Sequence, residues 1–136
     1  MCIGCKLANG ELPTYTIYED KDLRVILDLY PYSKGHMLIL TKEHYEGLVE
    51  LPQNLAHKIM DLSKTLTETV NRAFNPDSVI VLQNNGAMNS LKHYHYHVVP
   101  HYSDSDINTL YDTKVYADNS QERLTEIQET LLKVSN

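Results

Sequence analysis

The chain has 136 residues and a mass of 15.6 kDa, close to the size of one domain. Apolar residues make up 42% and charged residues 22%, which excludes a chain that is disordered throughout. The net charge of −6 argues against a broad basic face for nucleic acid. Residues 1–20 lack the apolar core of a secretory signal, and no apolar run is long enough to span a membrane. We therefore expect a cytoplasmic protein without a nucleic-acid or membrane partner.

The first half of the chain predicts a short helix and three strands. Residues 3–8 suit one helical turn, which Asn9-Gly10 would end. Residues 14–19 and 23–28 are rich in β-branched and apolar residues and flank a short turn, so they predict a hairpin. Residues 36–41 predict a third strand with buried side chains.

A long amphipathic helix is predicted for residues 53–74. Its apolar residues recur at steps of three and four and form one stripe: Leu55, Ile59, Leu62, Leu66, Val70 and Phe74. Asn75-Pro76 should end this helix.

The second half of the chain adds two strands and a helix. Residues 78–83 and 93–99 predict strands, the second ended by Pro100. Residues 101–119 are polar and acidic and predict a loop, and residues 120–134 have helical periodicity. Hairpins with one segregated long helix predict an α+β fold with an antiparallel sheet, as a single domain over residues 1–136. Residues 101–136 would form its extension, a loop followed by the C-terminal helix.

Cys2 and Cys5 form a C-x-x-C motif near the N-terminus. A structural disulfide is disfavoured in the cytosol, and a thioredoxin-like redox pair would follow a strand. Half a zinc site or two unrelated small residues are the remaining interpretations. Zinc would need two further ligands, for which histidine is the common choice.

Three histidines alternate with tyrosines in the segment 93–97, His-Tyr-His-Tyr-His. Strand periodicity places His93, His95 and His97 on one face, roughly 7 Å apart. The simplest interpretation is a solvated face of an edge strand. The functional alternatives are a metal site and nucleophilic catalysis by one imidazole. Three side chains in a straight row do not converge easily on one ion, so at least one should be free for other work.

An ordered set of motifs extends this pattern over roughly residues 2–100. Before His-Tyr-His-Tyr-His-Val-Val come Cys2-Ile3-Gly4-Cys5, Gly10-Glu11-Leu12-Pro13, Asp28, Gly35-His36, Thr41-Lys42-Glu43-His44 and Asn84-Asn85-Gly86. The sequence thereby resembles the histidine triad (HIT) family, in its branch of nucleotide hydrolases and transferases with an N-terminal C-x-x-C. The resemblance implies a five-stranded antiparallel sheet with one long helix. It also implies a homodimer, with the helix at 53–74 as the expected dimer element.

The resemblance further implies cleavage at the α-phosphorus of a purine nucleotide derivative. The middle histidine of the family motif is the nucleophile, which carries that role to His95 and a nucleotidyl-histidine intermediate with it. His97 would contact the phosphate or the leaving group. A phosphoramidate, a nucleotidyl ester and a dinucleoside polyphosphate are the candidate substrates.

Other nucleotide contacts are implied for Asp28, Asn84, Asn89 and Ser90. Asp28 would accept hydrogen bonds from the ribose hydroxyls, although it also suits the turn after a strand, as Asn84 does. Asn89 and Ser90 would donate to phosphoryl oxygens. Met88 stands where family members commonly have glycine, so we expect substrate choice or phosphate affinity to differ from the family norm.

The resemblance implies a closed structural zinc site made by Cys2, Cys5, His44 and His93, and no organic cofactor. His36 competes with His44 as the fourth ligand. His57 and His101 are expected at the surface.

Two other functions are also consistent with these motifs. The protein could be a nucleotide-binding regulatory dimer with little turnover. It could also be a metal-dependent enzyme or metal sensor that uses the histidine row itself.

Overall fold

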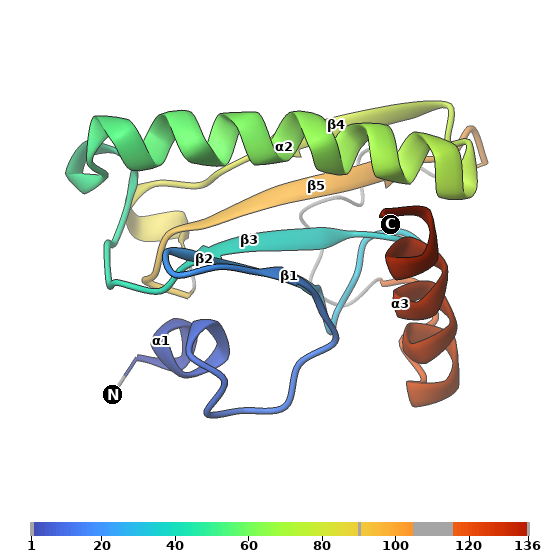
Figure 1. Cartoon of the computed structure of the whole chain (residues 1–136), viewed down its shortest axis with the longest axis horizontal. Coiled ribbons are helices and arrows are strands. Elements are labelled where there is room, and N and C mark those ends of the chain that lie inside the picture. Colours follow the sequence, from blue (N-terminus) through green and yellow to red (C-terminus); the bar gives the residue numbers. More distant parts are fainter. Residues whose placement is uncertain (1, 90, 105–115, 136) are drawn as a thin grey trace.

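The computed structural model describes residues 2–89, 91–104 and 116–135, without the side chain of Met88. It confirms the α+β prediction (Figure 1). The elements in chain order are α1 (Ile3–Ala8), β1 (Thr16–Glu19), β2 (Leu23–Leu27), β3 (Met37–Thr41), the short 3₁₀ helix η1 (Leu48–Glu50), α2 (Gln53–Phe74), β4 (Ser78–Leu82), the 3₁₀ helix η2 (Gly86–Met88), β5 (His95–His101) and α3 (Gln121–Ser135). Most of the loop predicted for 101–119 lies outside the described residues.

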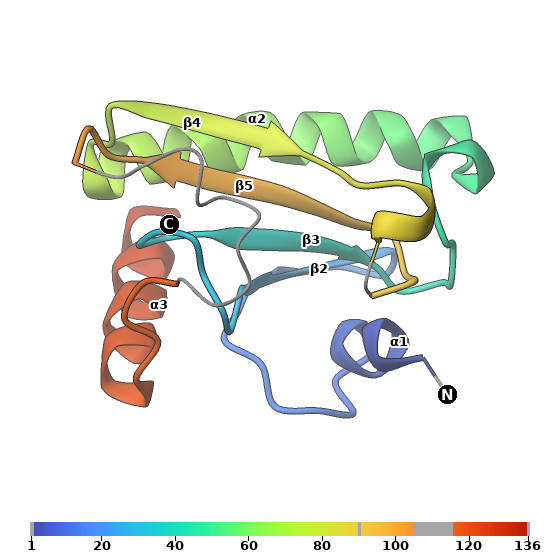
Figure 2. The same cartoon turned by 180° about the vertical axis from the view of Figure 1, so that it is seen from behind.

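The sheet has five antiparallel strands in the order β1-β2-β3-β5-β4. Neighbouring residues on a strand point to opposite faces, so the sheet has two different sides. One side is apolar and packs against α2 and α3, with Val25, Ile39 and Val98 fully buried. On the other side, Ile26, Leu38 and Leu40 pack with Ala8 of α1. Figures 1 and 2 show α2 running along the sheet and α1 well away from α2.

The predicted apolar stripe of α2 is confirmed by its packing. Ile59, Leu66 and Val70 are buried against the sheet, and the other stripe residues are partly buried around them. Asn75 ends the helix in a left-handed conformation with φ of 46°, and its N–H donates to the Asn71 carbonyl. Asparagine tolerates this conformation better than most residues, which explains the sharp end before Pro76.

The boundaries predicted for the last strand were wrong at both ends. Strand β5 begins at His95, because Lys92 adopts a left-handed conformation with φ of 54° and turns the chain just before it. The strand also continues through Pro100, which pairs with Val79 of β4. The pairing with β3 reaches only Val98, so Pro100 has a strand on one side alone. The Pro100 carbonyl accepts a hydrogen bond from the Ser33 hydroxyl. Proline lacks a backbone N–H, which costs no hydrogen bond between strands where there is no neighbouring strand.

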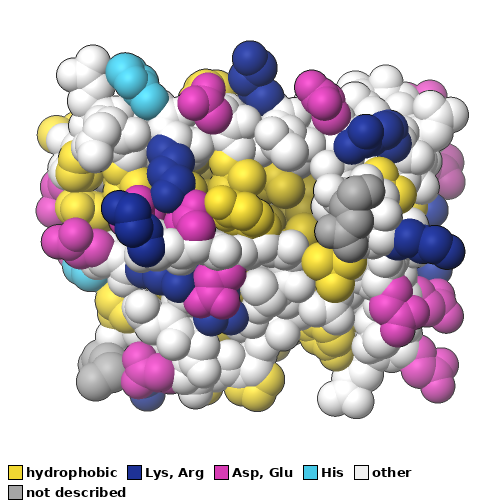
Figure 3. Space-filling model, viewed as in Figure 1, with side chains coloured by type: hydrophobic (Ala, Val, Ile, Leu, Met, Phe, Trp, Pro, Cys, Tyr) yellow, Lys and Arg dark blue, Asp and Glu magenta, His cyan; other side chains and the backbone are white. Residues whose placement is uncertain are grey.

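The surface carries charges of both signs. On the face in Figure 3, Lys and Arg side chains are interspersed with Asp and Glu, and acidic side chains gather over α3. Within the described residues, no helix combines the length and apolar character that crossing a bilayer requires.

Candidate functional site

Four polar side chains meet on the side of the sheet opposite α2: Asp28, His36, His95 and His97. Asp28 directly follows β2 and His36 directly precedes β3, and the Asp28 N–H donates to the His36 carbonyl at 3.0 Å. His95 and His97 pair with Leu40 and Leu38 of β3. Strand alternation therefore gathers residues that are up to 69 positions apart in the sequence.

His95 is held in one tautomer by the backbone. Its Nδ1 lies 2.7 Å from the carbonyl oxygen of His93, and a carbonyl can only accept, so Nδ1 carries the proton. The neutral ring then has its lone pair on Nε2. With 8% of its surface exposed, the His95 side chain is shielded but not fully enclosed.

His97 is oriented by a chain of hydrogen bonds that starts at the backbone. The Tyr32 N–H donates to His36 Nδ1 at 3.0 Å, so the proton of a neutral His36 is on Nε2. That Nε2–H donates to His97 Nδ1 at 2.9 Å, which leaves the proton of His97 on its own Nε2. Burial lowers the pKa of both His36 and His97 to about 3, so both rings are neutral at neutral pH. His97 thus offers a fixed N–H donor beside His95, with ring centres 4.9 Å apart.

Asp28 completes this cluster. Burial raises the pKa of its carboxyl group to about 6, although the Tyr30 N–H, 2.9 Å from Oδ1, acts in the opposite direction. Its other oxygen lies 3.5 Å from His36 Nε2. A half-buried carboxylate at this position is a strong acceptor for hydroxyl groups once it is ionised.

The remaining predicted nucleotide contacts lie in the segment between β4 and β5. Asn84 is half-buried two residues beyond β4, whose Leu82 pairs with His97. The Asn89 side chain is buried, and its amide N–H donates to the Glu46 carbonyl at 3.0 Å, while its Oδ1 has no hydrogen-bond partner among the described residues. Ser90 lies outside the described residues.

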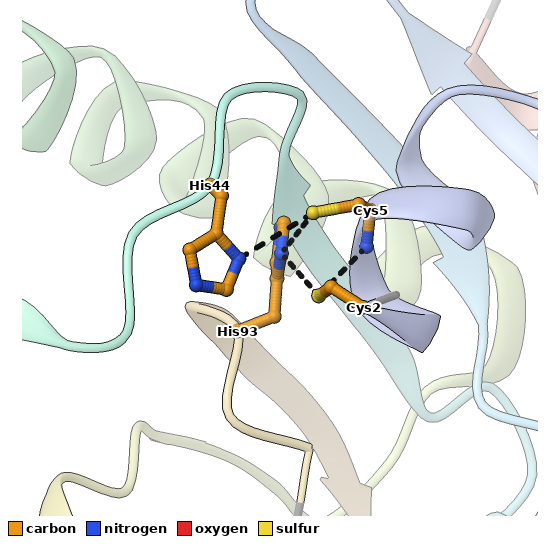
Figure 4. Close-up of side chains that lie close together, drawn as sticks. All are labelled: Cys2, Cys5, His44 and His93. Atoms are coloured by element: carbon orange, nitrogen blue, oxygen red, sulfur yellow. Dashed lines mark hydrogen bonds between the residues drawn. The ribbon is translucent and has the colours of Figure 1, made fainter.

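A second cluster joins Cys2, Cys5, His44 and His93, whose potential ligand atoms all lie within 4.8 Å of one another (Figure 4). Cys5 lies in α1 and Cys2 caps its N-terminus, while His44 comes from the segment after β3 and His93 from the turn before β5. The sulfur-to-Nδ1 distances are 3.3 Å for Cys2–His93, 3.4 Å for Cys5–His44 and 3.5 Å for Cys5–His93. Ligands of a tetrahedral zinc ion, bound at ~2.1–2.3 Å, lie roughly 3.5 Å apart, so this donor set fits zinc.

The geometry of His93 explains how it can serve this cluster. Its Nε2 lies 2.7 Å from the Thr41 carbonyl, so the proton is there and the lone pair of Nδ1 faces the sulfur atoms. His93 precedes the strand, which corrects the prediction that all three histidines share one strand face. Of the two histidines that compete as fourth ligand, His44 lies at the cysteines, whereas His36 lies at Asp28 and His97.

Gly4 is a site residue that the sequence reasoning did not single out. A Cβ atom at this position would lie 2.4 Å from Cβ of His93, so only glycine lets α1 approach the His93 ring. Its place inside C-x-G-C was the available signal. The predicted surface position is confirmed for His57, whereas His101 lies in β5, half-buried against Tyr32.

Comparisons with known proteins agree with this architecture. The chain is 37% identical over 101 residues to an adenosine 5′-monophosphoramidase of Schizosaccharomyces pombe, covering 73% of each chain. A hypothetical histidine triad nucleotide-binding protein from Sulfolobus tokodaii strain7 superposes with a TM-score of 0.85 at 26% identity, over 98% of this chain and 91% of that one. A zinc-bound histidine triad family protein from Mycobacterium smegmatis gives a TM-score of 0.81 at 25% identity, over 98% and 92% of the two chains.

A family model described as HIT domain matches residues 9–104, which include both histidine clusters except for the two cysteines. The motifs noted in the sequence, the sheet order and the relatives lead to one assignment. The chain belongs to the HIT domain family.

Proposed function

We propose that the protein is a nucleotide hydrolase that cleaves at the α-phosphorus of a purine nucleotide derivative, with a phosphoramidate as the first substrate to test. The observation that carries this is the single tautomer of His95, whose Nε2 lone pair lies beside the N–H donor of His97. The relative from Schizosaccharomyces pombe, named an adenosine 5′-monophosphoramidase, supports the substrate class.

The proposed reaction has two displacements at phosphorus. His95 Nε2 attacks, and the bond from phosphorus to the leaving amine breaks as the bond to nitrogen forms. The amine leaves with the bonding pair and takes a proton from solvent. The His93 carbonyl stabilises the positive ring that results, through the hydrogen bond from Nδ1. Water then attacks phosphorus and releases a proton, and the electron pair returns to Nε2.

The neighbouring side chains bind and orient the nucleotide in this proposal. The Nε2–H of His97 donates to a phosphoryl oxygen, and Asp28 accepts from the ribose hydroxyls. Asn84, Asn89 and Ser90 are retained as nucleotide contacts. Since the Asn89 amide also donates to Glu46, a contact with phosphate would use its second N–H.

The test is His95→Ala assayed on adenosine 5′-monophosphoramidate. We expect kcat to fall by at least about 10³-fold, because no other group in the site replaces the nucleophile. AMP affinity, measured by calorimetry, should change much less. The matched control is His57→Ala, which removes an exposed imidazole from α2 and should leave kcat unchanged. Acid-quenched wild-type enzyme should carry an adenylyl group on His95, detected by mass spectrometry.

Two results would contradict the proposal. Unchanged turnover in His95→Ala would exclude His95 as the nucleophile. AMP binding without turnover of any phosphoramidate, ester or dinucleoside polyphosphate would favour the regulatory nucleotide-binding dimer instead.

We also propose that Cys2, Cys5, His44 and His93 hold a structural zinc ion. The donor set is closed at four protein ligands, and the zinc-bound relative from Mycobacterium smegmatis supports it. The ion would bind α1 to the turn that leads into β5 and would take no part in the chemistry.

A homodimer in the cytoplasm completes the proposal. β4 is an edge strand of the sheet, with Val81 at 46% exposure, and Met60 on the neighbouring helix α2 is 55% exposed. An open edge next to exposed apolar side chains suits pairing with a second copy. Sedimentation equilibrium should give twice the chain mass, and Val81→Lys should shift the mass towards the monomer.

A further inference from the structure

Two exposed tyrosines, Tyr30 and Tyr116, lie against each other next to the proposed nucleotide site. Their ring centres are 5.6 Å apart at an interplanar angle of 75°, an edge-to-face arrangement. Tyr30 is 68% exposed and Tyr116 is 46% exposed. Large aromatic side chains that remain this accessible as a pair commonly mark a binding surface.

Hydrogen bonds fix the two backbone segments that carry this tyrosine pair. Tyr116 belongs to the segment that leads into α3, and this segment lies beside the loop between β2 and β3 (Figure 2). The Ala117 N–H donates to the Pro31 carbonyl at 2.8 Å, and the Asn119 side chain donates to the Leu29 carbonyl at 2.7 Å. These two hydrogen bonds hold the segment that carries Tyr116 against the loop that carries Tyr30.

The position of the pair relative to Asp28 suggests its ligand. The Tyr30 N–H donates to the Asp28 carboxylate, so the platform begins at the proposed ribose acceptor. Asp28 in turn lies with His36 and His97, and the His97 ring is adjacent to His95. If the phosphorus of a nucleotide lies at His95 and its ribose at Asp28, its base extends beyond Asp28 and needs a binding surface there. Nucleobases stack favourably on aromatic side chains whatever their sequence context.

We propose that Tyr30 and Tyr116 form a stacking platform for the purine base of the substrate, an inference that depends on the proposed nucleotide site. Tyr116 lies outside the part of the chain that the family model matches, residues 9–104. The platform is thus a feature that this chain adds to the site. It would favour a ligand with a purine base over a ligand that lacks a base.

The test compares AMP with ribose 5-phosphate, which has the same sugar and phosphate but no base. Dissociation constants for both ligands are measured by calorimetry on the full chain. We expect Tyr30→Ala and Tyr116→Ala each to weaken AMP binding by about 5- to 30-fold, the range of one lost base–aromatic contact. Binding of ribose 5-phosphate should change by less than about twofold.

Two control variants sharpen the measurement. Tyr30→Phe keeps the ring and should bind AMP as the wild type does. Tyr18→Ala removes a tyrosine of β1 that is 41% exposed, and it should leave the ratio of the two affinities unchanged.

Several outcomes would overturn the platform. An unchanged ratio of affinities in both alanine variants would assign the pair to holding the C-terminal segment. Equal losses for both ligands would show that the tyrosines shape the loop around Asp28 instead. A wild type that binds neither ligand and has no turnover would remove the proposed function and the platform together, whereas the first two outcomes leave the proposed function standing.

Discussion

Backbone groups determine the tautomer of individual histidines in the two clusters. The tautomer decides which ring nitrogen donates a hydrogen bond and which one has a free lone pair. Three carbonyl or amide groups, from His93, Thr41 and Tyr32, determine which nitrogen carries the proton in His95, His93 and His36. A backbone partner cannot change its own donor or acceptor character, so these tautomers do not depend on the neighbouring side chains.

Asp28 provides a prediction of pH dependence. Its pKa is raised to about 6 by burial, so the carboxyl group gains a proton, and loses part of its acceptor capacity, as the pH falls through 6. Above pH 7, Asp28→Asn should weaken AMP binding by roughly 10- to 100-fold, the worth of hydrogen bonds to a charged group. The difference between wild type and variant should shrink towards pH 5.

This comparison is made as the ratio of the two AMP affinities between pH 5 and pH 8. The ratio cancels the titration of the AMP phosphate, which both proteins experience equally. A ratio that stays constant over this range would show that Asp28 does not titrate there or does not contact the nucleotide.

Gly4 provides a prediction about the proposed zinc site of Cys2, Cys5, His44 and His93. In Gly4→Ala, the new methyl group would meet Cβ of His93 at 2.4 Å, so α1 must move away from the ring. We expect zinc affinity to fall by at least about tenfold, because a small displacement of two ligands disrupts tetrahedral geometry. Competition with a chromogenic chelator measures this affinity. Gly86→Ala is the control, since no atom lies within 4 Å of a Cβ there, although its φ of +84° adds backbone strain.

At the scale of the elements, the limits of α2 were predictable from its sequence, whereas β5 was predicted as a strand with the wrong limits. The helical periodicity of apolar residues continues over the 22 residues of α2, and Asn75-Pro76 marks its end. Local sequence signals therefore determine both the presence of the helix and its C-terminal limit. The limits of β5 depend on its neighbours: β3 pairs with it only as far as Val98, and this frees one side of Pro100. A rule that excludes proline from strands fails where a strand has a partner on one side alone.

The buried stripe of α2 predicts a stability difference between two nearby positions. Leu66 is 3% exposed, and Leu66→Ala should lower the free energy of unfolding by about 2–5 kcal/mol through the lost burial and the cavity. Lys64→Ala, two residues earlier on the exposed face, should change it by less than about 0.5 kcal/mol. Urea denaturation of both variants measures the difference. Equal changes in the free energy of unfolding for the two variants would show that the face of α2 with Leu66 does not contribute to the hydrophobic core.

At the scale of the whole molecule, the proposed zinc cluster of Cys2, Cys5, His44 and His93 connects segments that are far apart in the sequence. It joins the N-terminal helix to the turn before β5, and the His93 carbonyl of that turn holds His95. The segment that holds the proposed nucleophile is thereby connected to the N-terminal helix, whose Ala8 also packs against the sheet.

Zinc removal should therefore lower thermal stability without deleting a catalytic group. Protein purified without added zinc should contain about one equivalent per chain, and its Tm should fall by several degrees on chelation. The variant Cys5→Ser should have the lower Tm before chelation and show little further change. A metal content below about 0.2 equivalents would refute the structural role.

The sequence by itself predicted the type and order of the main elements and the family, since these follow from local periodicity and ordered motifs. The tertiary structure decided which partners the histidines and tyrosines have. His44 and His36 are equivalent as letters, and only the fold places one at the cysteines and the other at Asp28. The same holds for the Tyr30–Tyr116 pair, whose members are 86 positions apart. Long-range proximity comes from how the strands and helices pack, and no local pattern records it.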